Sequence, residues 1–170
     1  AMNYTKLTTK NVIRIQRLVN QLLQFREIES NTIRPCPSSG DLILYVSELF
    51  NMFIPLAEGK YIITQIDSFS DELLVSFDHE LIEKIFSNLF SNAIKYTPEN
   101  SKIVLSAKRI ENKILIEVQD DGNGVLHPDQ LFEMFYTENN RGGDTRRGMG
   151  LGLSLCKSII QSHGGTIWVE

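Results

Sequence analysis

The chain has 170 residues, of which 42% are hydrophobic and 22% are charged, a composition typical of one globular domain with a small appendage. Its formal net charge is −4, so the overall charge favours neither nucleic acid nor an anionic membrane as a partner. The two cysteines, Cys36 and Cys156, are too few for a disulfide framework and fit a reducing compartment. Cys156 lies in an apolar run and is predicted to be buried. No apolar run is long enough to span a bilayer.

Residues 5–29 are predicted to form a helix. Apolar residues recur in it at helical spacing, as at Val12, Ile15 and Val19, and neither glycine nor proline interrupts the run. The apolar stripe is broad, which favours packing against a partner helix, and we therefore expect a homodimer that forms through residues 5–29. The alternative is a helix that packs on its own domain.

Residues 31–40 are predicted to be a linker and to mark the main domain boundary. Pro35 and Pro37 each remove an amide donor and bias their neighbours away from helix. Directly after this linker, Asp41 is a candidate N-cap for a helix that extends to Gly59.

The remainder of the chain, residues 41–170, alternates between the patterns of strands and helices. An amphipathic helix is predicted over 78–96 with Asp78 as its N-cap, and the alternating segments on either side of Glu111 and Asn112 predict a hairpin. We therefore expect an α/β (α+β) two-layer sandwich, in which helices cover one face of a mixed, mostly antiparallel sheet, preceded by the long N-terminal helix. The other predicted elements are strands at 61–66, 73–77 and 166–170 and a helix over 151–165.

Two asparagines on the helix 78–96, Asn88 and Asn92, are candidates for binding a metal or a phosphate. Because they are four residues apart, they project from the same helical face, where buried amides need partners. An amide oxygen is a hard ligand that suits Mg²⁺ bound to nucleotide phosphates. Lys95 and Tyr96 follow and offer a cation for phosphate and a ring for stacking on a base. Taken alone, the asparagine pair is equally compatible with ordinary capping or surface amides.

Asp120, Gly122 and Gly124 lie in a turn directly after a predicted strand. Glycine lets the backbone turn sharply and approach a ligand closely. A carboxylate at the end of a strand can accept a hydrogen bond from an exocyclic amine such as that of adenine. The alternative is a simple Asp-Gly turn, from which this segment alone is hardly distinguishable.

Residues 146–153 alternate glycines with other residues at the start of a predicted helix. Backbone N–H groups beside the positive end of a helix dipole form an anion site, and Arg146 and Arg147 precede it. The polar, glycine-rich segment 137–147 indicates a lid over phosphates, with a flexible surface loop as the alternative. The sequence contains neither a Walker A loop nor a dinucleotide-binding fingerprint.

Taken together and in this order, these segments resemble the catalytic domain of sensor histidine kinases, within the gyrase/Hsp90/histidine kinase/MutL ATPase superfamily. Each motif is weak evidence alone, whereas the whole set in the right order and spacing is specific. The resemblance covers roughly residues 41–170 and implies a Bergerat-type ATP-binding fold. Its motifs are an N box at 88–98, a G1 box at 120–124, an F box at 132–136, a G2 box at 148–153 and the segment 163–166.

The resemblance implies a role for each matching residue of the helix 78–96. Asn92 would coordinate Mg²⁺, and Asn88 and Lys95 would lie near the phosphates. Tyr96 would line the adenine pocket. Hydrolytic members of the superfamily carry a water-activating glutamate at the position of Asn88. Because an asparagine is no general base, phosphoryl transfer to an acceptor is favoured over hydrolysis, and catalysis would rest on positioning and charge neutralisation.

The glycine-rich segments would complete a site for ATP and Mg²⁺, the two cofactors that the resemblance implies. Asp120 would bind the adenine amino group, and Gly122 and Gly124 would shape the pocket. Arg146 or Arg147 would reach the phosphates. The residues expected at the lid hinge and phosphate contact are Gly148, Gly150, Leu151 and Gly152. The expected catalytic residues are Asn88, Lys95, Arg146 and Arg147.

Residues 3–30 resemble the second helix of the dimerisation hairpin that precedes this domain in the family. The acceptor histidine belongs to the first helix of that hairpin, which is absent here, and it matches none of His79, His127 and His163. We therefore expect the chain to bind Mg·ATP and to transfer the γ-phosphoryl group in trans, to a histidine on a dimerisation domain. Because the sequence stops at Glu170, we also expect the catalytic domain to lack its last strand.

The same resemblance implies the partners and the location of the protein. The expected partners are the phosphoacceptor hairpin of the same protein and the receiver domain of a response regulator, with no nucleic acid among them. The expected location is cytoplasmic, in a parent protein that is often tethered to a membrane in this family. Two alternatives remain open: a hydrolytic ATPase or serine kinase of the same superfamily, and a non-enzymatic docking or dimerisation module with a decayed nucleotide site.

Overall fold

A computed structural model describes residues 33–67, 73–137 and 150–170 of the chain, together with isolated positions between Val12 and Arg26. Those isolated positions are all helical, in agreement with the predicted N-terminal helix. The helices of the described ranges are α2 (Leu42–Glu58), α3 (His79–Tyr96) and α4 (Gly152–Ser162), with a short 3-10 turn at Pro128–Gln130. The strands are β1 (Ser38–Asp41), β2 (Ile63–Ile66), β3 (Leu74–Phe77), β4 (Lys102–Ile110) and β5 (Lys113–Asp120).

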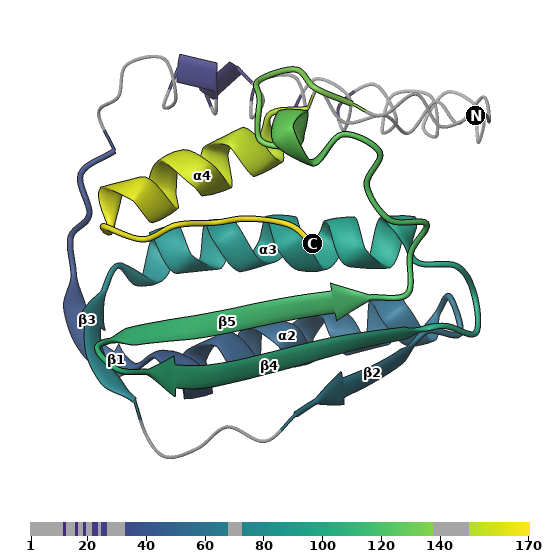
Figure 1. Cartoon of the computed structure of the whole chain (residues 1–170), viewed down its shortest axis with the longest axis horizontal. Helices are drawn as coiled ribbons and strands as arrows, with labels where there is room; N and C mark the ends of the chain where they lie inside the picture. Colours follow the sequence, from purple (N-terminus) through teal and green to yellow (C-terminus); the bar gives the residue numbers. More distant parts are fainter. Residues whose placement is uncertain are drawn as a thin grey trace.

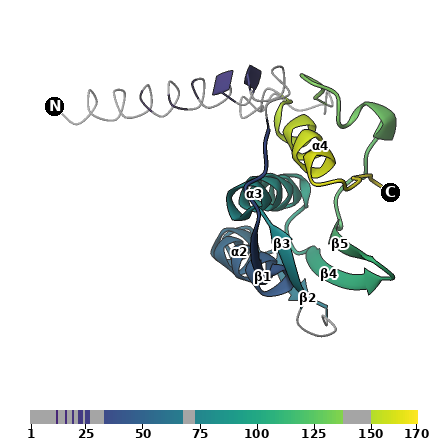
Figure 2. The same ribbon diagram turned by 90° about the vertical axis from the view of Figure 1, so that its left-hand side faces the viewer.

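The strands of the described ranges form two sheets. In the larger sheet, β4 lies in the centre, pairs in parallel with β2 and pairs antiparallel with β5. The smaller sheet is the antiparallel pair of β1 and β3. Helices α2 and α3 lie side by side along the β4–β5 hairpin, and α4 packs beside α3 (Figures 1 and 2). The α+β class of the prediction is therefore confirmed, whereas the single sheet is replaced by two.

Strand β1 overlaps the end of the predicted linker at 31–40. Its first residues, Ser38–Gly40, lie in the segment assigned to the linker, and the strand pairs with β3 in the register Ser38↔Phe77 to Asp41↔Leu74. The segment carries none of the alternating apolar residues that mark a strand in sequence. Its strand conformation comes from the ladder that β3 offers, because pairing depends more on the partner than on intrinsic preference.

The strand predicted at 166–170 is not present in the structure, which describes these residues. The described residues after α4 run without a strand assignment to Glu170. Ile167 packs against the core, whereas Trp168 is exposed. An apolar, β-branched segment becomes a strand only where it finds a partner ladder, and this segment has none among the described strands.

The core lies between the helices and the larger sheet, and its largest members are aromatic. Phe90 of α3 is 1% exposed, and its ring lies 5.0 Å from that of Phe50, 5.6 Å from that of Phe53 and 5.5 Å from that of Phe86. These rings join α2 to α3, so the position of α3 relative to the sheet is fixed by burial of its apolar face.

Both predicted N-caps are present. The Asp41 carboxylate accepts hydrogen bonds from the N–H groups of Ile43 and Leu44 at the start of α2. The Asp78 carboxylate accepts from Leu81 N–H at 3.0 Å at the start of α3, and its second oxygen accepts from Cys36 N–H at 2.7 Å. A cap satisfies N–H groups that the helix leaves without partners, so each of these helices begins where its sequence predicts.

Candidate functional site

Helix α3 carries four of the predicted site residues along one side of its second half. Asn88 and Asn92 are half-buried, and Lys95 and Tyr96 are exposed at its C-terminal end. The helix is amphipathic, with its buried face directed into the core, so the asparagines lie at the border between core and solvent. At that border a side chain can contact a polar ligand in solvent while it stays packed against the core.

Asn88 faces the start of α4. Its side-chain Nδ2 donates a hydrogen bond to the Lys84 carbonyl oxygen at 2.8 Å, and a Cβ atom on Gly152 would lie closer than 3.0 Å to its Oδ1. The first residue of α4 therefore packs directly on the asparagine, where only glycine fits without displacement. This contact brings the predicted G2 segment against the predicted N box.

Gly150 and Leu151, which precede α4, are held by packing. Gly150 has φ +71°, and a Cβ there would come closer than 3.0 Å to the backbone of Phe135 and Tyr136. Its carbonyl oxygen accepts a hydrogen bond from Phe135 N–H at 3.0 Å. Leu151 is 2% exposed, so its side chain belongs to the interior and only its backbone can face a ligand.

The Asp120 turn lies at the C-terminal end of α3, about two turns beyond Asn88. The Asp120 Oδ1 accepts a hydrogen bond from Gly122 N–H at 2.9 Å, which leaves its second oxygen for another donor. A Cβ on Gly122 would come closer than 3.0 Å to that Oδ1 and 3.5 Å from the Tyr96 carbonyl oxygen. Gly124 follows with φ +70°. The predicted G1 turn is therefore folded against the last turn of α3.

Lys95 and Tyr96 interact with each other. The Lys95 Nζ donates to the Tyr96 hydroxyl at 2.8 Å and lies 4.5 Å from the centre of its ring. Both side chains are exposed, so a ligand that competes for the ammonium group needs only a rotamer change, with no change of the fold.

The predicted site residues Arg146, Arg147 and Gly148 lie outside the described residues, as does nearly all of the predicted lid at 137–147. The structure thus brings Gly152 against Asn88 midway along α3, and it brings the Asp120–Gly122 turn against Tyr96 at the C-terminal end, with Asn92 on α3 between these two places.

The described donors suit an ion that takes most of its ligands from elsewhere. Among residues 33–67, 73–137 and 150–170, no three His, Cys, Asp or Glu side chains gather into a group that could hold a metal. Mg²⁺ keeps several waters and phosphate oxygens and takes only one or two protein oxygens. The half-buried amide of Asn92 fits that requirement.

Sequence reasoning missed two residues at the C-terminal end of α3. Lys60, in the turn between α2 and β2, donates to carbonyl oxygens of this helix end. Thr97 is the C-cap residue: its backbone N–H donates to the Ala93 carbonyl oxygen, and the residue is only 1% exposed. Nothing in the local pattern around Lys60 distinguishes it from a surface lysine, since its acceptors lie more than 30 residues away.

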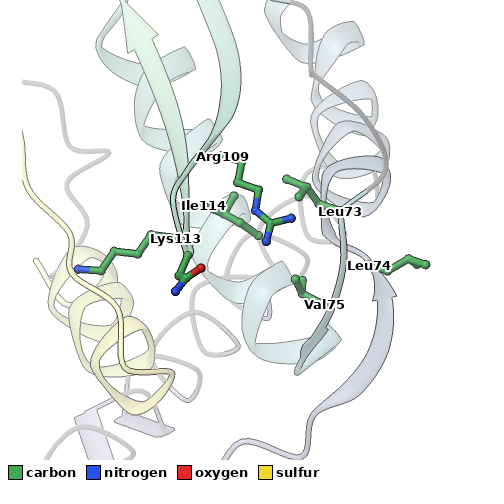
Figure 3. A pocket seen from close by; sticks show the side chains of 7 residues that line it. Leu73, Leu74, Val75, Arg109, Lys113 and Ile114 are labelled. Atoms are coloured by element: carbon green, nitrogen blue, oxygen red, sulfur yellow. The ribbon is translucent and has the colours of Figure 1, made fainter.

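A hollow of about 290 Å³ lies at a distance from this set (Figure 3). It opens between β3 and the tip of the β4–β5 hairpin, where Arg109 projects toward β3. Because β5 runs from the hairpin tip to Asp120, about 23 Å of strand separates the hollow from the Asp120 turn. The lining residues are Leu73, Leu74, Val75, Arg109, Asn112, Lys113 and Ile114.

Residues 77–170 match the family described as histidine kinase-, DNA gyrase B-, and HSP90-like ATPase. The alginate biosynthesis sensor protein KinB of Pseudomonas aeruginosa is 35% identical over 160 residues, which cover 92% of this chain and 26% of that protein. The chain therefore spans about a quarter of the length of this curated relative.

Solved structures are similar as well. The catalytic domain of the histidine kinase ThkA is 27% identical, with a TM-score of 0.68 over 78% of this chain and 86% of that chain. The structure of ThkA in complex with the response regulator protein TrrA has a TM-score of 0.72 over 97% of this chain and 46% of that chain. At 24% identity, the second likeness shows the fold alone. Within the described residues, no helix is long and apolar enough to cross a membrane.

Proposed function

The chain belongs to the histidine kinase-, DNA gyrase B-, and HSP90-like ATPase family, as the catalytic domain of a sensor histidine kinase of two-component signalling, and from this membership we propose that it binds Mg·ATP and transfers the γ-phosphoryl group to a histidine on a dimerisation domain. The observation that carries the proposal is the position of α3. The Asp120 turn packs against Tyr96 at one end of its polar border, and the glycine start of α4 packs against Asn88 at the other.

The adenine end of the proposed site is the Asp120 turn. One carboxylate oxygen of Asp120 is engaged by Gly122 N–H, so the other accepts the adenine amino group. The exposed ring of Tyr96 offers an apolar surface beside the base. A carboxylate accepts hydrogen bonds only, which favours adenine over guanine, whose corresponding position carries a carbonyl oxygen.

The phosphate end of the proposed site lies where α3 meets the start of α4, from Asn88 to Asn92. Asn92 supplies an amide oxygen for Mg²⁺, which neutralises charge on the phosphates when it is bound. Lys95 exchanges its contact with the Tyr96 hydroxyl for a phosphate oxygen, and the backbone N–H groups at the start of α4 complete the anion site. Arg146 or Arg147 adds a cation in this proposal.

The proposed chemistry is transfer rather than hydrolysis. An acceptor histidine nitrogen bonds to the γ-phosphorus as the bond to the ADP oxygen breaks, and ADP leaves with the electron pair. Asn88 has no basic group with which to activate water, and its Nδ2 is held by the Lys84 carbonyl oxygen. The domain therefore contributes position and charge compensation, and water takes no part in the proposed step.

The proposed partners follow from the same family membership. They are the phosphoacceptor hairpin and the receiver domain of a response regulator, as in the complex of ThkA with TrrA. We propose that two copies associate through residues 5–29, since Val12, Val19, Leu22 and Leu23 are exposed apolar side chains. The proposed location is the cytoplasmic side of a signalling protein.

Paired substitutions test this function. Asp120→Asn is expected to weaken Mg·ATP binding at least tenfold, because an amide only partly matches the adenine amino group. Asn92→Ala is expected to abolish transfer to a separate hairpin that carries its histidine, while the domain stays folded. Isothermal titration calorimetry measures the first effect and acid-labile label on the hairpin measures the second.

The matched controls are Asp129→Asn and Asn112→Ala, which make the same changes at exposed positions outside the predicted motifs. Both controls are expected to bind ATP as the unaltered chain does. Unaltered ATP affinity in Asp120→Asn contradicts the adenine assignment. If the chain releases inorganic phosphate from ATP at the same rate with and without the hairpin, the result favours a hydrolase instead.

A further inference from the structure

Lys60 closes the C-terminal end of α3 from outside the helix. Its Nζ donates hydrogen bonds to the carbonyl oxygens of Ile94 at 2.5 Å and Thr97 at 3.1 Å, and it lies 3.4 Å from the carbonyl oxygen of Lys95. The last carbonyl groups of a helix have no partner within it, and the helix dipole makes this end negative. One ammonium group therefore satisfies several acceptors that otherwise need water or a capping glycine.

The backbone around Lys60 is fixed by its own turn. Lys60 N–H donates to the Ala57 carbonyl oxygen at 2.9 Å, and Ile62 N–H donates to the same oxygen at 3.0 Å. Tyr61 adopts φ +56°, an unusual conformation for a residue with a side chain. These bonds set the direction in which the lysine leaves the backbone, so the ammonium group is held at the helix end.

The turn that carries Lys60 is also bonded to the loop after α3. The Tyr61 carbonyl oxygen accepts from Asn100 N–H at 3.1 Å, and Ile63 N–H donates to the Ser101 carbonyl oxygen at 2.8 Å. Asn100 is itself in the left-handed region, with φ +61°. The two segments thus form one bonded unit, and the side chain of Lys60 is its link to the helix proper.

The helix end that Lys60 holds is a wall of the nucleotide site. Lys95 and Tyr96 lie in its last turn, and the Tyr96 carbonyl oxygen lies 3.5 Å from the position of a Cβ on Gly122. The hydroxyl of Thr97, the C-cap residue, is buried and makes no hydrogen bond in the described part of the chain, so it does not hold this turn. A shift of the last turn changes the gap between Tyr96 and the Asp120 turn.

We propose that Lys60 is a positioning residue for adenine: by binding the carbonyl oxygens at the end of α3, it fixes Tyr96 against the Asp120–Gly122 turn and so sets affinity and selectivity for the base. This inference rests on the proposed nucleotide-binding function. Lys60 itself makes no contact with the nucleotide. Its role is distinct from that of Asn92, which lies a full turn earlier on α3 and serves the phosphate end.

The test compares Lys60→Met, Lys60→Arg and the matched control Lys157→Met, an exposed lysine on α4. Calorimetric titration of the full chain measures the dissociation constants of Mg·ATP and Mg·GTP, and thermal unfolding confirms that each variant folds. Methionine keeps the length of the stem and removes the charge, whereas arginine keeps donors that reach the same carbonyl oxygens.

Lys60→Met is expected to weaken Mg·ATP binding about tenfold and Mg·GTP binding less than threefold, so that discrimination between the bases falls. Lys60→Arg is expected to retain most of both values, and Lys157→Met to change neither. If Lys60→Met does not fold, Lys60→Gln supplies the test: its amide is neutral and its stem is shorter, so it is expected to lower the ATP-to-GTP discrimination in the same direction, and unchanged discrimination in this variant also overturns the inference.

An unchanged ratio of ATP to GTP affinity in a folded Lys60→Met variant overturns the inference, whether neither affinity changes or both fall equally. The proposed function is tested separately, because Asp120→Asn lowers ATP affinity whether or not Lys60 has this role. Should Asp120→Asn also leave ATP binding intact, it is the function that fails.

Discussion

The two ends of α3 are both held by a charged side chain, yet the two ends serve the molecule differently. At the N-terminal end, the carboxylate of Asp78 caps Leu81 N–H and binds Cys36 N–H. At the C-terminal end, the ammonium group of Lys60 binds the carbonyl oxygens of Ile94 and Thr97. Each charge has the sign that complements the helix dipole at its end, and each joins α3 to a segment distant in sequence.

The difference lies in what is next to each end. Helix α3 has 18 residues, so its ends are about 27 Å apart. The Asp78 end borders β1 and the segment before it, with no predicted site residue near it. The Lys60 end carries Lys95 and Tyr96 beside the Asp120 turn. The same physical device should therefore act on stability at one end and on ligand binding at the other.

The largest loss of stability is expected from a substitution in the middle of α3, where the helix packs into the core on which both of its ends depend. Phe90→Ala removes a ring that packs on Phe50, Phe53 and Phe86 and is expected to lower the free energy of unfolding by about 3–5 kcal/mol. Urea unfolding followed by circular dichroism measures the loss. The control Leu74→Ala removes an exposed side chain, and a comparable loss there would contradict this account of the core.

A smaller effect, confined to stability, is expected at the Asp78 end. Asp78→Ala is expected to lower the free energy of unfolding by about 1 kcal/mol through loss of the cap, with the dissociation constant of Mg·ATP unchanged. Urea unfolding and calorimetric titration of the same sample measure both quantities. A change in ATP affinity as large as that of Lys60→Met would remove the distinction between the two ends.

The pH dependence at this end has a definite sign. Hydrogen bonds from the N–H groups of Cys36 and Leu81 lower the pKa of Asp78. A carboxyl group with a lowered pKa in the folded state stabilises the fold above its unfolded pKa of about 3.9, and that stabilisation is lost as pH falls through the folded pKa. Asparagine also caps helices but does not titrate. The stability gap between the unaltered chain and Asp78→Asn is therefore expected at pH 7 and should narrow as the pH falls below the unfolded pKa and through the lowered pKa of the folded state.

The smallest expected effect is a difference in labelling rate between the two thiols, which lie at different depths around α3. Cys36 is exposed and bonded through its backbone at the Asp78 end, whereas Cys156 is 0% exposed and packs near the Ile85 carbonyl oxygen. Burial raises the pKa of Cys156 to about 12, so almost no thiolate forms at pH 8. A disulfide reagent should label one thiol rapidly and the second only in denaturant, with ATP affinity unchanged. Rapid labelling of both would show that the α3–α4 contact opens.

Local signals predicted much of this fold. The caps Asp41 and Asp78, the helix over 78–96 and the hairpin at Glu111 and Asn112 each depend on residues a few positions apart, and all are present. The burial of Cys156 was likewise predicted from the apolar run around it. In these cases the interactions that decide the structure lie within one element or one turn.

The features that sequence did not predict all depend on distant partners. Strand β1 forms because β3 pairs with it, while the apolar segment at 166–170 forms no strand because it lacks such a partner among the described strands. Gly150 was expected to face an anion, and its conformation is set at least as much by the backbone of Tyr136. Lys60 reaches acceptors 34 to 37 residues away. The roles of Asn92 and of the arginines stay predictions.

Strand β1 is the element that we expect to detach first when tension acts on the N-terminal side of the domain. A pull transmitted through Ile33 loads the bond from Cys36 N–H to Asp78 before it reaches Ser38, which bonds to His79 and begins the short ladder with β3. Isolated hydrogen bonds of about 1 kcal/mol each yield one at a time, so tension on the N-terminal side peels β1 from β3. The rings around Phe90 and the bonds of Lys60 lie outside that line of force, so we expect the C-terminal end of α3 to keep its shape while the N-terminal connection lengthens.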